Sequence, residues 1–305
     1  MVIGGSTASG KSALALELAR RIDGIVVNAD SQQLFVDLPK LTARPTAAET
    51  AAVPHRLYGA LAATEQPSVG RWLHLVAEAL AEARRLGRTA VVTGGSGLYL
   101  HALLHGLPAM PEIPAGLRAE LRAFARTAPP ERLHDRLAAR DPRMAARLHP
   151  TDPQRVLRAL EVVEASGRSL LAWQADPRQR LPLPARLAGF ALVPPAAVVN
   201  ARIEARLRGM IAGGVLAEVQ ELMARRPDAT SLPIAKVHGL RELAQVCRKE
   251  LALEPASRSI AAQTRQYAKR QRTWFRHQLP ELQPIESSGD GDEAIELMLD
   301  RLGTR

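Results

Sequence analysis

The sequence predicts an α/β fold built on a parallel sheet, interrupted by an all-helical insertion. Short β-branched runs alternate with longer helical patterns over the first hundred residues, which is typical of parallel strands joined by crossover helices. The strand-like runs are 2–3, 24–28 and 89–93, and a helix is expected from about Gly10. Only three residues precede Gly4, so the first strand is expected to have little length.

The strand signal disappears between about Met110 and Pro184, where stretches rich in Arg, Ala and Leu take over. Prolines flank this region on both sides, as is common at the borders of separate segments. A strand-like run from Leu187 to Val193 then returns the chain to the sheet. We therefore expect a discontinuous core of residues 1–109 and 186–305, and a helical insertion domain over residues 110–185.

Composition limits the compartment and the cofactors. The 305 residues are 46% hydrophobic and 24% charged, as in an ordinary soluble chain of one large or two modest domains. No apolar run approaches the roughly 18 residues that a membrane span needs, and no charged leader precedes the first strand, so we expect a cytoplasmic protein. A single cysteine, Cys247, excludes intramolecular disulfides and a zinc site built on several thiolates.

The charge balance favours a polyanionic partner. The chain has 41 basic and 31 acidic side chains and a formal net charge of +10. Residues 236–276 alone hold ten Lys or Arg and three Glu, a net charge of +7. Most of the excess positive charge therefore lies near the C-terminus.

A glycine-rich run follows the first strand and leads into an amphipathic helical pattern. It fits G-x-x-x-x-G-K-[ST], in which backbone N–H groups at a helix N-terminus surround a phosphate. Lys11 would add a cation, and the Ser12 hydroxyl would be a ligand for Mg²⁺. We therefore predict a P-loop NTPase-like core whose phosphate-binding residues are Gly5, Ser6, Thr7, Ala8, Ser9, Gly10, Lys11 and Ser12.

The loop alone leaves the phosphate compound open, because nucleotide kinases, NTPases and diphosphate-releasing transferases all use it. The third strand-like run ends in Thr93 and two glycines and lacks the Asp that would carry magnesium in an NTPase. Asp30 follows the second strand, so it is expected beside the P-loop at the ligand edge of the sheet. Asp and Ser are also common helix N-caps, and position alone does not decide between the two roles of Asp30.

Motifs along most of the chain resemble those of the bacterial tRNA dimethylallyltransferase family. In chain order they are the P-loop, 30–35, 42–46, 54–57, 94–99, 147–162, 202–206 and 263–276. This chain departs from the family pattern at Ser6, Phe35, Ser96 and Leu240. None of these departures removes a charged catalytic group.

The resemblance implies transfer of a dimethylallyl group from dimethylallyl diphosphate to N6 of the adenosine adjoining the anticodon, position 37 of tRNA. Diphosphate would leave with the help of Mg²⁺ bound at Ser12. Asp30 is expected to be the general base, because an exocyclic adenine amine is a poor nucleophile. Thr7, near the bridging oxygen, and Arg206 are expected to stabilise the departing diphosphate.

The resemblance also implies contacts with the anticodon stem-loop of tRNA. A helix is predicted from Asp152 to Ser166, with Pro153 at its first position. From spacing alone, a solvated face is the default interpretation of the polar residues on this helix. By resemblance, the expected tRNA contacts are instead Asp30, Ser31, Gln32, Gln33, Ser96, Arg118, Gln154, Arg155, Val156, Leu157 and Arg158.

A second predicted helix, 257–279, carries a basic stripe at helical spacing. No Asp or Glu occurs from 255 to 280, so we expect the stripe to contact tRNA phosphates, with a solvated basic face as the alternative. Trp274 and Phe275 fall on the opposite side, which would dock on the core. The stripe consists of Arg258, Arg265, Lys269, Arg272 and Arg276.

Three other functions stay open at this point. A small-molecule P-loop kinase would turn over ATP, but it has no use for the basic helix. An isopentenyltransferase acting on free adenine nucleotides would share the N-terminal motifs, and a non-catalytic tRNA-binding protein would keep the basic helix. We expect a monomer that acts on tRNA and dimethylallyl diphosphate, away from membranes.

Overall fold

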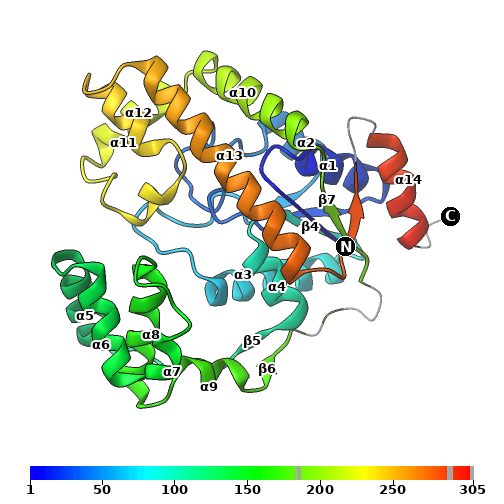
Figure 1. The fold of residues 1–305 in the computed structure, drawn as a ribbon. Helices are drawn as coiled ribbons and strands as arrows, with labels where there is room; N and C mark the ends of the chain where they lie inside the picture. The colour runs from blue at the N-terminus through cyan, green and yellow to red at the C-terminus, as the bar shows by residue number, and fades with distance from the viewer. Residues whose placement is uncertain (182, 184–186, 287–290, 303–305) are drawn as a thin grey trace. The chain divides into compact units, whose positions relative to one another are not determined.

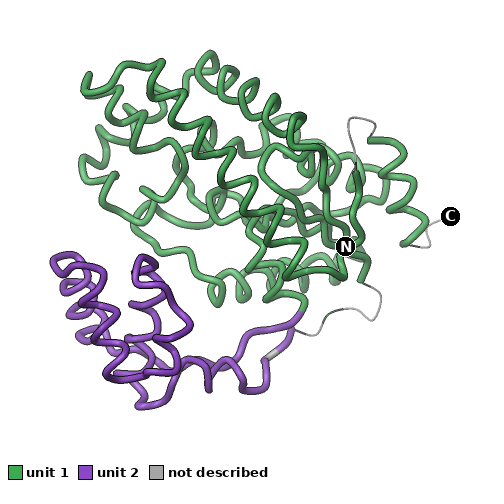
Figure 2. Tube along the Cα trace, viewed as in Figure 1, with its two compact units in different colours: residues 1–104, 182–305 green, residues 105–181 purple. Residues whose placement is uncertain are grey.

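The computed structural model describes residues 1–181, 183, 187–286 and 291–302. The chain divides into two compact units, one made of residues 1–104 and 182–305 and the other of residues 105–181 (Figure 2). The insertion thus begins and ends a few residues before the expected limits of 110 and 185. The expected boundary at 185 and 186 itself lies outside the described residues.

The larger unit contains a parallel sheet in the order β3-β2-β4-β1-β7-β8. In the central strand, β1, Ile3 pairs with Thr93 on one side and with Phe190 on the other. All four residues of β1 are buried, so a short strand suffices here. The strands are β1 (Val2–Gly5), β2 (Ile25–Asn28), β3 (His55–Arg56), β4 (Ala90–Gly94), β7 (Gly189–Leu192) and β8 (Gln283–Ile285).

Helices lie on both faces of this sheet (Figure 1). Ile3 packs against α1, whereas the next residue, Gly4, contacts Phe275 of α13, and successive residues of a strand point to opposite faces. The helices of this unit are α1 (Lys11–Arg21), α2 (Ala47–Ala52), α3 (Val69–Arg85), α4 (Gly97–His105), α10 (Ala196–Ala212), α11 (Val215–Arg225), α12 (Leu240–Cys247), α13 (Leu253–Gln278) and α14 (Gly291–Leu302), with the 3₁₀ helix η1 (Pro233–Lys236).

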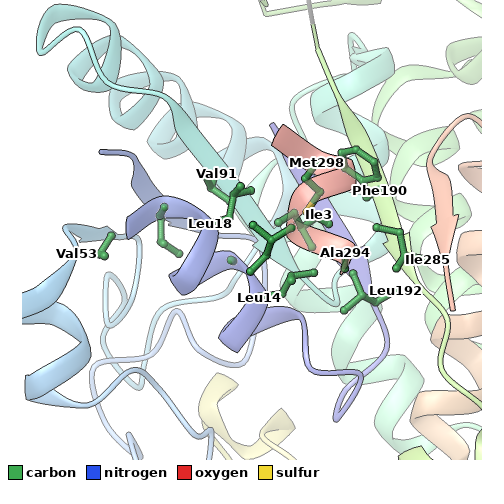
Figure 3. Packing of buried hydrophobic residues seen from close by; sticks show 14 residues of the cluster. Ile3, Leu14, Leu18, Val53, Val91, Phe190, Leu192, Ile285, Ala294 and Met298 are labelled. Carbon is green, nitrogen blue, oxygen red and sulfur yellow. The ribbon is translucent and has the colours of Figure 1, made fainter. Parts of the chain in front are cut away.

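A hydrophobic core fixes α1 on one face of the sheet (Figure 3). Leu14 and Leu18 lie one turn apart on α1, the spacing of the buried stripe of an amphipathic helix. They pack with apolar residues of β1, β4, β7 and α14, such as Val91, Phe190 and Met298. Each buried side chain of this size stabilises the fold by about 1.5–3 kcal/mol. The helix that follows the P-loop is therefore firmly anchored.

The insertion unit has a core of its own. Leu121, Leu137 and Leu160 are fully buried where α5, α6 and α8 meet. The helices are α5 (Ala115–Thr127), α6 (Pro130–Arg140), α7 (Pro142–Ala145), α8 (Pro153–Ser166) and α9 (Leu170–Ala175). The prediction of an all-helical insertion is wrong at one place, where β5 (Leu107–Pro108) pairs antiparallel with β6 (Arg178–Gln179). Two-residue strands beside prolines are too short to show an alternating pattern.

The 26-residue helix α13 begins at Leu253, four residues before the predicted start, and ends at Gln278. It approaches the sheet closely at Gly4 of β1, where an added Cβ would lie 2.6 Å from the Phe275 ring. Phe275 is buried, as the predicted docking face requires.

Two more glycines, in the turn between β4 and α4, allow α13 to pack closely. A Cβ on Gly95 would collide with the side-chain amide of Gln271, and a Cβ on Gly97 would collide with the Trp274 ring. Because any larger residue would occupy this space, these glycines are required for the packing of α13.

β3, β8 and α14 were not predicted from the sequence. β3 has two residues and β8 has three, too few for a period-two pattern. α14 contributes Ala294, Ile295 and Met298 to the core beside α1, although the sequence after Pro284 gave no clear signal. None of the helices in the described parts of the chain is long and apolar enough to cross a membrane.

Gly97→Ala should lower the free energy of unfolding by about 1–3 kcal/mol, because the added methyl group overlaps the Trp274 ring. Urea unfolding followed by circular dichroism would measure this. Gly209→Ala on α10 is the matched control, since nothing lies within 4 Å of an added Cβ there. Its stability should stay equal or rise by about 0.5–1 kcal/mol. Equal stability of Gly97→Ala and wild type would contradict the close packing of α13.

Candidate active site

The glycine-rich run forms a loop between β1 and α1, as predicted. Gly10 is the N-cap of α1 and has a φ of 97°, in the left-handed region that favours glycine. The Lys11 ammonium donates to the carbonyl oxygen of Ser6 at 3.0 Å. The first turn of α1 has no acidic residue, so the partial positive charge at its N-terminus stays available to an anion.

Two helices from the C-terminal half of the chain hold this loop. The Arg202 guanidinium on α10 donates to the carbonyl oxygen of Ser9 at 3.0 Å. The backbone N–H of Thr7 donates to Oε1 of Gln271 on α13 at 2.8 Å. Ala8 packs against both helices, at Val199, Ile203 and Ala268. The conformation of the loop thus depends on α10 and α13.

Two cations and one carboxylate gather beside the loop. Burial lowers the pKa of Lys11 to about 8; the Asp30 carboxylate opposes this shift and the Arg206 guanidinium adds to it. Burial also lowers the pKa of Arg206, again opposed by Asp30. Arg206 donates to the carbonyl oxygen of Thr42 at 3.1 Å. Since the cations outnumber the carboxylate, the site favours a polyanionic ligand.

Asp30 begins a turn and does not cap a helix. Its Oδ1 accepts from the Gln32 backbone N–H at 3.0 Å, and its own N–H donates to Oδ1 of Asn28 at 2.8 Å. The next helix in the described chain, α2, begins at Ala47. The helix N-cap interpretation of Asp30 is therefore wrong, and the turn fixes its carboxylate at the end of β2.

The residues after Asp30 form internal hydrogen bonds. The Ser31 N–H donates to Oγ of Ser96 at 2.9 Å. Gln32 Oε1 accepts from the backbone N–H of His238 at 3.0 Å, and the Gln33 amide donates to two backbone carbonyl oxygens at 3.0 Å. These bonds give the three side chains a role in shaping the site, and their contact with tRNA stays a prediction.

One cavity joins the P-loop to the Asp30 turn and to α10 and α13. Its polar lining includes Thr7, Asp30 and Arg206, so the structure brings all three expected catalytic residues together. A ligand with an anionic group and a hydrocarbon part fits such a mixed lining. The apolar side chains of the cavity are Leu41, Ile203, Leu207, Met210, Ile260 and Ala261.

Oxygen donors at the P-loop fit Mg²⁺, which keeps several waters and takes one or two protein ligands beside substrate phosphates. Ser12 is exposed in the first turn of α1. The buried hydroxyls of Ser9 and Thr93 form no hydrogen bond within the described chain. No group of three or more His, Cys, Asp or Glu gathers among the described residues. The donors present therefore suit a magnesium ion held jointly by Ser12 and the phosphates of a ligand.

The helix α8 of the insertion unit begins as predicted. The Asp152 side chain accepts from the Arg155 N–H at 3.3 Å, and Pro153 occupies the first position. Gln154 and Arg155 are exposed, as a nucleic-acid contact requires. Arg158 is partly exposed and pairs with the buried carboxylate of Glu161 at 3.4 Å.

Val156 does not fit its expected role. Its side chain is fully buried in the core of the insertion unit, so the prediction that it contacts tRNA is wrong. Leu157 is partly buried against the same core. Helical periodicity explains this, because a run of five successive residues covers both the inner and the outer face of a helix. Arg118 on α5 is partly exposed, and its expected tRNA contact stays a prediction.

The basic stripe of α13 is partly neutralised. Arg258 pairs with Glu254, which belongs to the helix because α13 starts earlier than predicted. Arg265 pairs with Glu204 of α10 at 3.3 Å. Although no Asp or Glu occurs from 255 to 280, Glu254 and Glu204 thus neutralise two positions of the stripe, and its contact with tRNA phosphates stays a prediction. Its other members, Lys269, Arg272 and Arg276, form no ion pair with any residue that the structure describes.

Four residues of the site had no role predicted from the sequence. Arg202 and Gln271 hold the P-loop, while His238 and Tyr267 line the cavity with ring centroids 4.6 Å apart. Burial is the main cause that lowers the pKa of His238 and raises that of Tyr267. One signal was available for Gln271, a polar residue on the side of α13 that faces the core.

The fold and the site together define an α/β protein in which a glycine-rich loop, a carboxylate and an apolar wall meet in one cavity. Within that class, the chain belongs to the IPP transferase family, whose profile matches residues 33–278.

Proteins with similar sequences carry names consistent with this family. The tRNA dimethylallyltransferase of Rhodospirillum rubrum is 48% identical over 279 residues, which cover 92% of this chain and 85% of that protein. The corresponding enzyme of Nitrobacter hamburgensis is 50% identical over 281 residues, which cover 92% and 88%.

Solved structures also match. A tRNA isopentenylpyrophosphate transferase from Bacillus halodurans is 30% identical with a TM-score of 0.71, covering 99% of this chain and 95% of its own. A eukaryotic dimethylallyltransferase acting on tRNA shares the fold, with a TM-score of 0.80 at 23% identity over 100% of this chain and 79% of that one. The α/β fold predicted from the sequence is confirmed.

Lys11 should make anion binding at the P-loop depend on pH. A bound diphosphate favours the charged lysine, so binding takes up a proton once the free site has lost it above its pKa of about 8. Affinity for inorganic diphosphate should therefore weaken above about pH 8, by up to about tenfold per pH unit. Calorimetric titration across this range would measure it.

Lys11→Arg provides the control for this measurement, because a guanidinium stays charged throughout the range. Comparing the two proteins in the same buffers cancels the ionisation of the ligand itself. Identical pH profiles would contradict a lowered pKa for Lys11.

Proposed function

We propose that this chain transfers a dimethylallyl group from dimethylallyl diphosphate to N6 of the adenosine adjacent to the anticodon, position 37 of tRNA. The observation that carries this proposal is the single cavity that combines the P-loop residue Thr7, the Asp30 carboxylate and Arg206 with an apolar wall. Diphosphate matches the cationic part of this lining, and a five-carbon tail matches the apolar part.

In the proposed reaction, the N6 amine attacks the allylic carbon in line with the leaving group. A C–N bond forms, the C–O bond to diphosphate breaks, and the departing oxygen keeps the electron pair. Asp30 accepts the amine proton, because the lone pair of an adenine amine is delocalised and the nitrogen becomes acidic only as it is alkylated. The turn that holds Oδ1 of Asp30 keeps the carboxylate aimed at the cavity.

Developing charge on the diphosphate would be stabilised by the P-loop amides, the Lys11 ammonium, the Thr7 hydroxyl and Arg206. Mg²⁺ held by Ser12 would add Lewis-acid stabilisation of the same oxygens. Lys11 and Arg206 are both desolvated by burial. Their interaction with an anion is stronger there than it would be in water.

The tRNA would be recognised in its anticodon stem-loop. On the larger unit, Lys269, Arg272 and Arg276 offer phosphate contacts, and Ser96 lies at the Asp30 turn. On the insertion unit, the exposed Gln154 and Arg155 and the partly exposed Arg158 and Arg118 are the candidates. A tRNA substrate also favours the cytoplasm as the compartment.

Incubation with labelled dimethylallyl diphosphate and either bulk tRNA or AMP tests the proposal, with ATP hydrolysis measured in parallel. We expect label in tRNA, none in AMP and no ATP hydrolysis. Label in AMP alone would indicate a transferase for free nucleotides. Magnesium-dependent ATP hydrolysis unaffected by dimethylallyl diphosphate would indicate a kinase or NTPase, and tRNA binding without labelling would indicate a non-catalytic protein.

Asp30→Asn should lower kcat at saturating substrates by about 10²- to 10⁴-fold, the usual contribution of a general base, and leave tRNA affinity unchanged. Steady-state kinetics and filter binding would measure the two quantities. Asp23→Asn is the matched control, since it removes an exposed carboxylate on the turn after α1. More than about a tenth of wild-type kcat in Asp30→Asn would exclude the general-base role.

Replacing both Lys269 and Arg272 with Ala should weaken the binding of all tRNAs to a similar extent. The slope of log K against log[salt] should flatten by roughly one per lost phosphate contact. Replacing Arg20 and Arg85, two exposed basic residues on other helices, is the control and should leave the slope unchanged. An unchanged slope in the first double variant, with its circular dichroism intact, would mean that this part of α13 faces only solvent.

A further inference from the structure

The side chain of Gln271 connects the two loops of the site, although it lies on α13. It is buried, with 5% of its surface exposed. Its Oε1 accepts from the Thr7 backbone N–H at 2.8 Å, and its Nε2 donates to the carbonyl oxygen of Gly95 at 2.8 Å. Both polar ends of one amide are therefore used, one on the P-loop and one on the turn after β4.

The connection continues from Gln271 to the segment that carries Asp30. Gly95 is followed by Ser96, whose Oγ accepts from the Ser31 backbone N–H at 2.9 Å and whose own N–H donates to the carbonyl oxygen of Ala29 at 3.1 Å. Ala29 and Ser31 flank Asp30 in the sequence. The side chains of Gln271 and Ser96 thus join the P-loop at Thr7 to the turn that carries Asp30.

The side-chain amide of Gln271 has little free space around it. Gly95 has no Cβ, and a Cβ there would overlap the Gln271 amide. Removing the amide would leave the partly buried Thr7 N–H without a partner and the buried Gly95 carbonyl with only the Gly97 N–H at 3.0 Å, and the loss of a partner in such a place is costly. The amide of Gln271 is therefore matched to both neighbours.

We infer that Gln271 is a positioning residue that sets the separation of Thr7, beside the leaving group, from Asp30, beside the attacking amine. This inference rests on the proposed function. Transfer requires the reacting groups to be aligned, and a misplacement of about 1 Å can reduce the rate about 10²-fold. Gln271 touches neither reacting group, so it acts through Thr7 and through the turn at Gly95.

The location of Gln271 also has a consequence for tRNA. Lys269 and Arg272, two and one positions away, lie on the same helix, and Lys269 is exposed while Arg272 is partly exposed. A movement of α13 on binding a polyanion would be transmitted to the P-loop through the Gln271 amide. Loss of the amide should leave the basic stripe, and hence tRNA affinity, intact.

Gln271→Met keeps the length of the side chain and removes both hydrogen bonds. We expect kcat at saturating substrates to fall about 10- to 100-fold and the Kd for inorganic diphosphate to rise several-fold. The Kd for tRNA and its salt slope should not change. Gln278→Met, at the exposed C-terminal end of the same helix, is the matched control and should resemble wild type in every measurement.

A double-mutant cycle separates positioning from a general loss of structure. If Gln271 acts through Thr7, Thr7→Ala combined with Gln271→Met should be little worse than Thr7→Ala alone. Additive losses in kcat, or kcat of Gln271→Met within about twofold of wild type, would overturn the inference while leaving the proposed function in place. Should Gln271→Met not fold, Ser96→Ala breaks the link between the Gly95 turn and Ser31 and should lower kcat at saturating substrates without weakening diphosphate binding; unchanged kcat would then overturn the inference.

Failure of the proposed function would be seen differently, as the absence of transfer to tRNA by the wild-type protein. In that case the Kd for inorganic diphosphate still tests the inference, because Gln271 holds the P-loop whatever the reaction. Equal Kd values for diphosphate in wild type and Gln271→Met would then overturn it.

Discussion

The close packing of α13 against glycines is the constraint on which the rest of the site depends. Phe275, Gln271 and Trp274 occupy the space that side chains at Gly4, Gly95 and Gly97 would fill. Because the helix lies so near the sheet, its Gln271 amide can reach the P-loop and its other residues can form one wall of the cavity. Glycines that would suggest flexible turns from the sequence here leave the space into which the side chains of α13 pack.

Electrostatics and shape act together in this cavity. Lys11 and Arg206 are both drawn out of water, and Asp30 is the carboxylate that opposes their desolvation. A diphosphate would supply the missing negative charge and release Asp30 from part of this interaction, leaving it to accept a proton. The apolar residues of α10 and α13 would meanwhile exclude water from the allylic carbon.

The sequence was a good guide wherever local patterns have a strong physical cause. The strand-loop-helix around Gly10, the parallel strands and the cap of α8 at Asp152 were all predicted, because each depends on neighbouring residues. The resemblance grouped Asp30, Thr7 and Arg206, and all three line one cavity in the structure. The resemblance wrongly placed Val156 among the tRNA contacts. Val156 is buried, and a motif of successive residues covers both the inner and the outer face of a helix.

Other features depend on residues far apart in the sequence, and no local pattern reports them. Arg202 and Gln271 bind P-loop residues that lie 193 and 264 positions earlier in the sequence, respectively. A chain made from its N-terminus exposes the P-loop first, while the side chains that shape it arrive last. A premature stop before α13 would therefore yield a product that keeps the glycine-rich motif and Arg202 but lacks the Gln271 amide that holds the loop at Thr7.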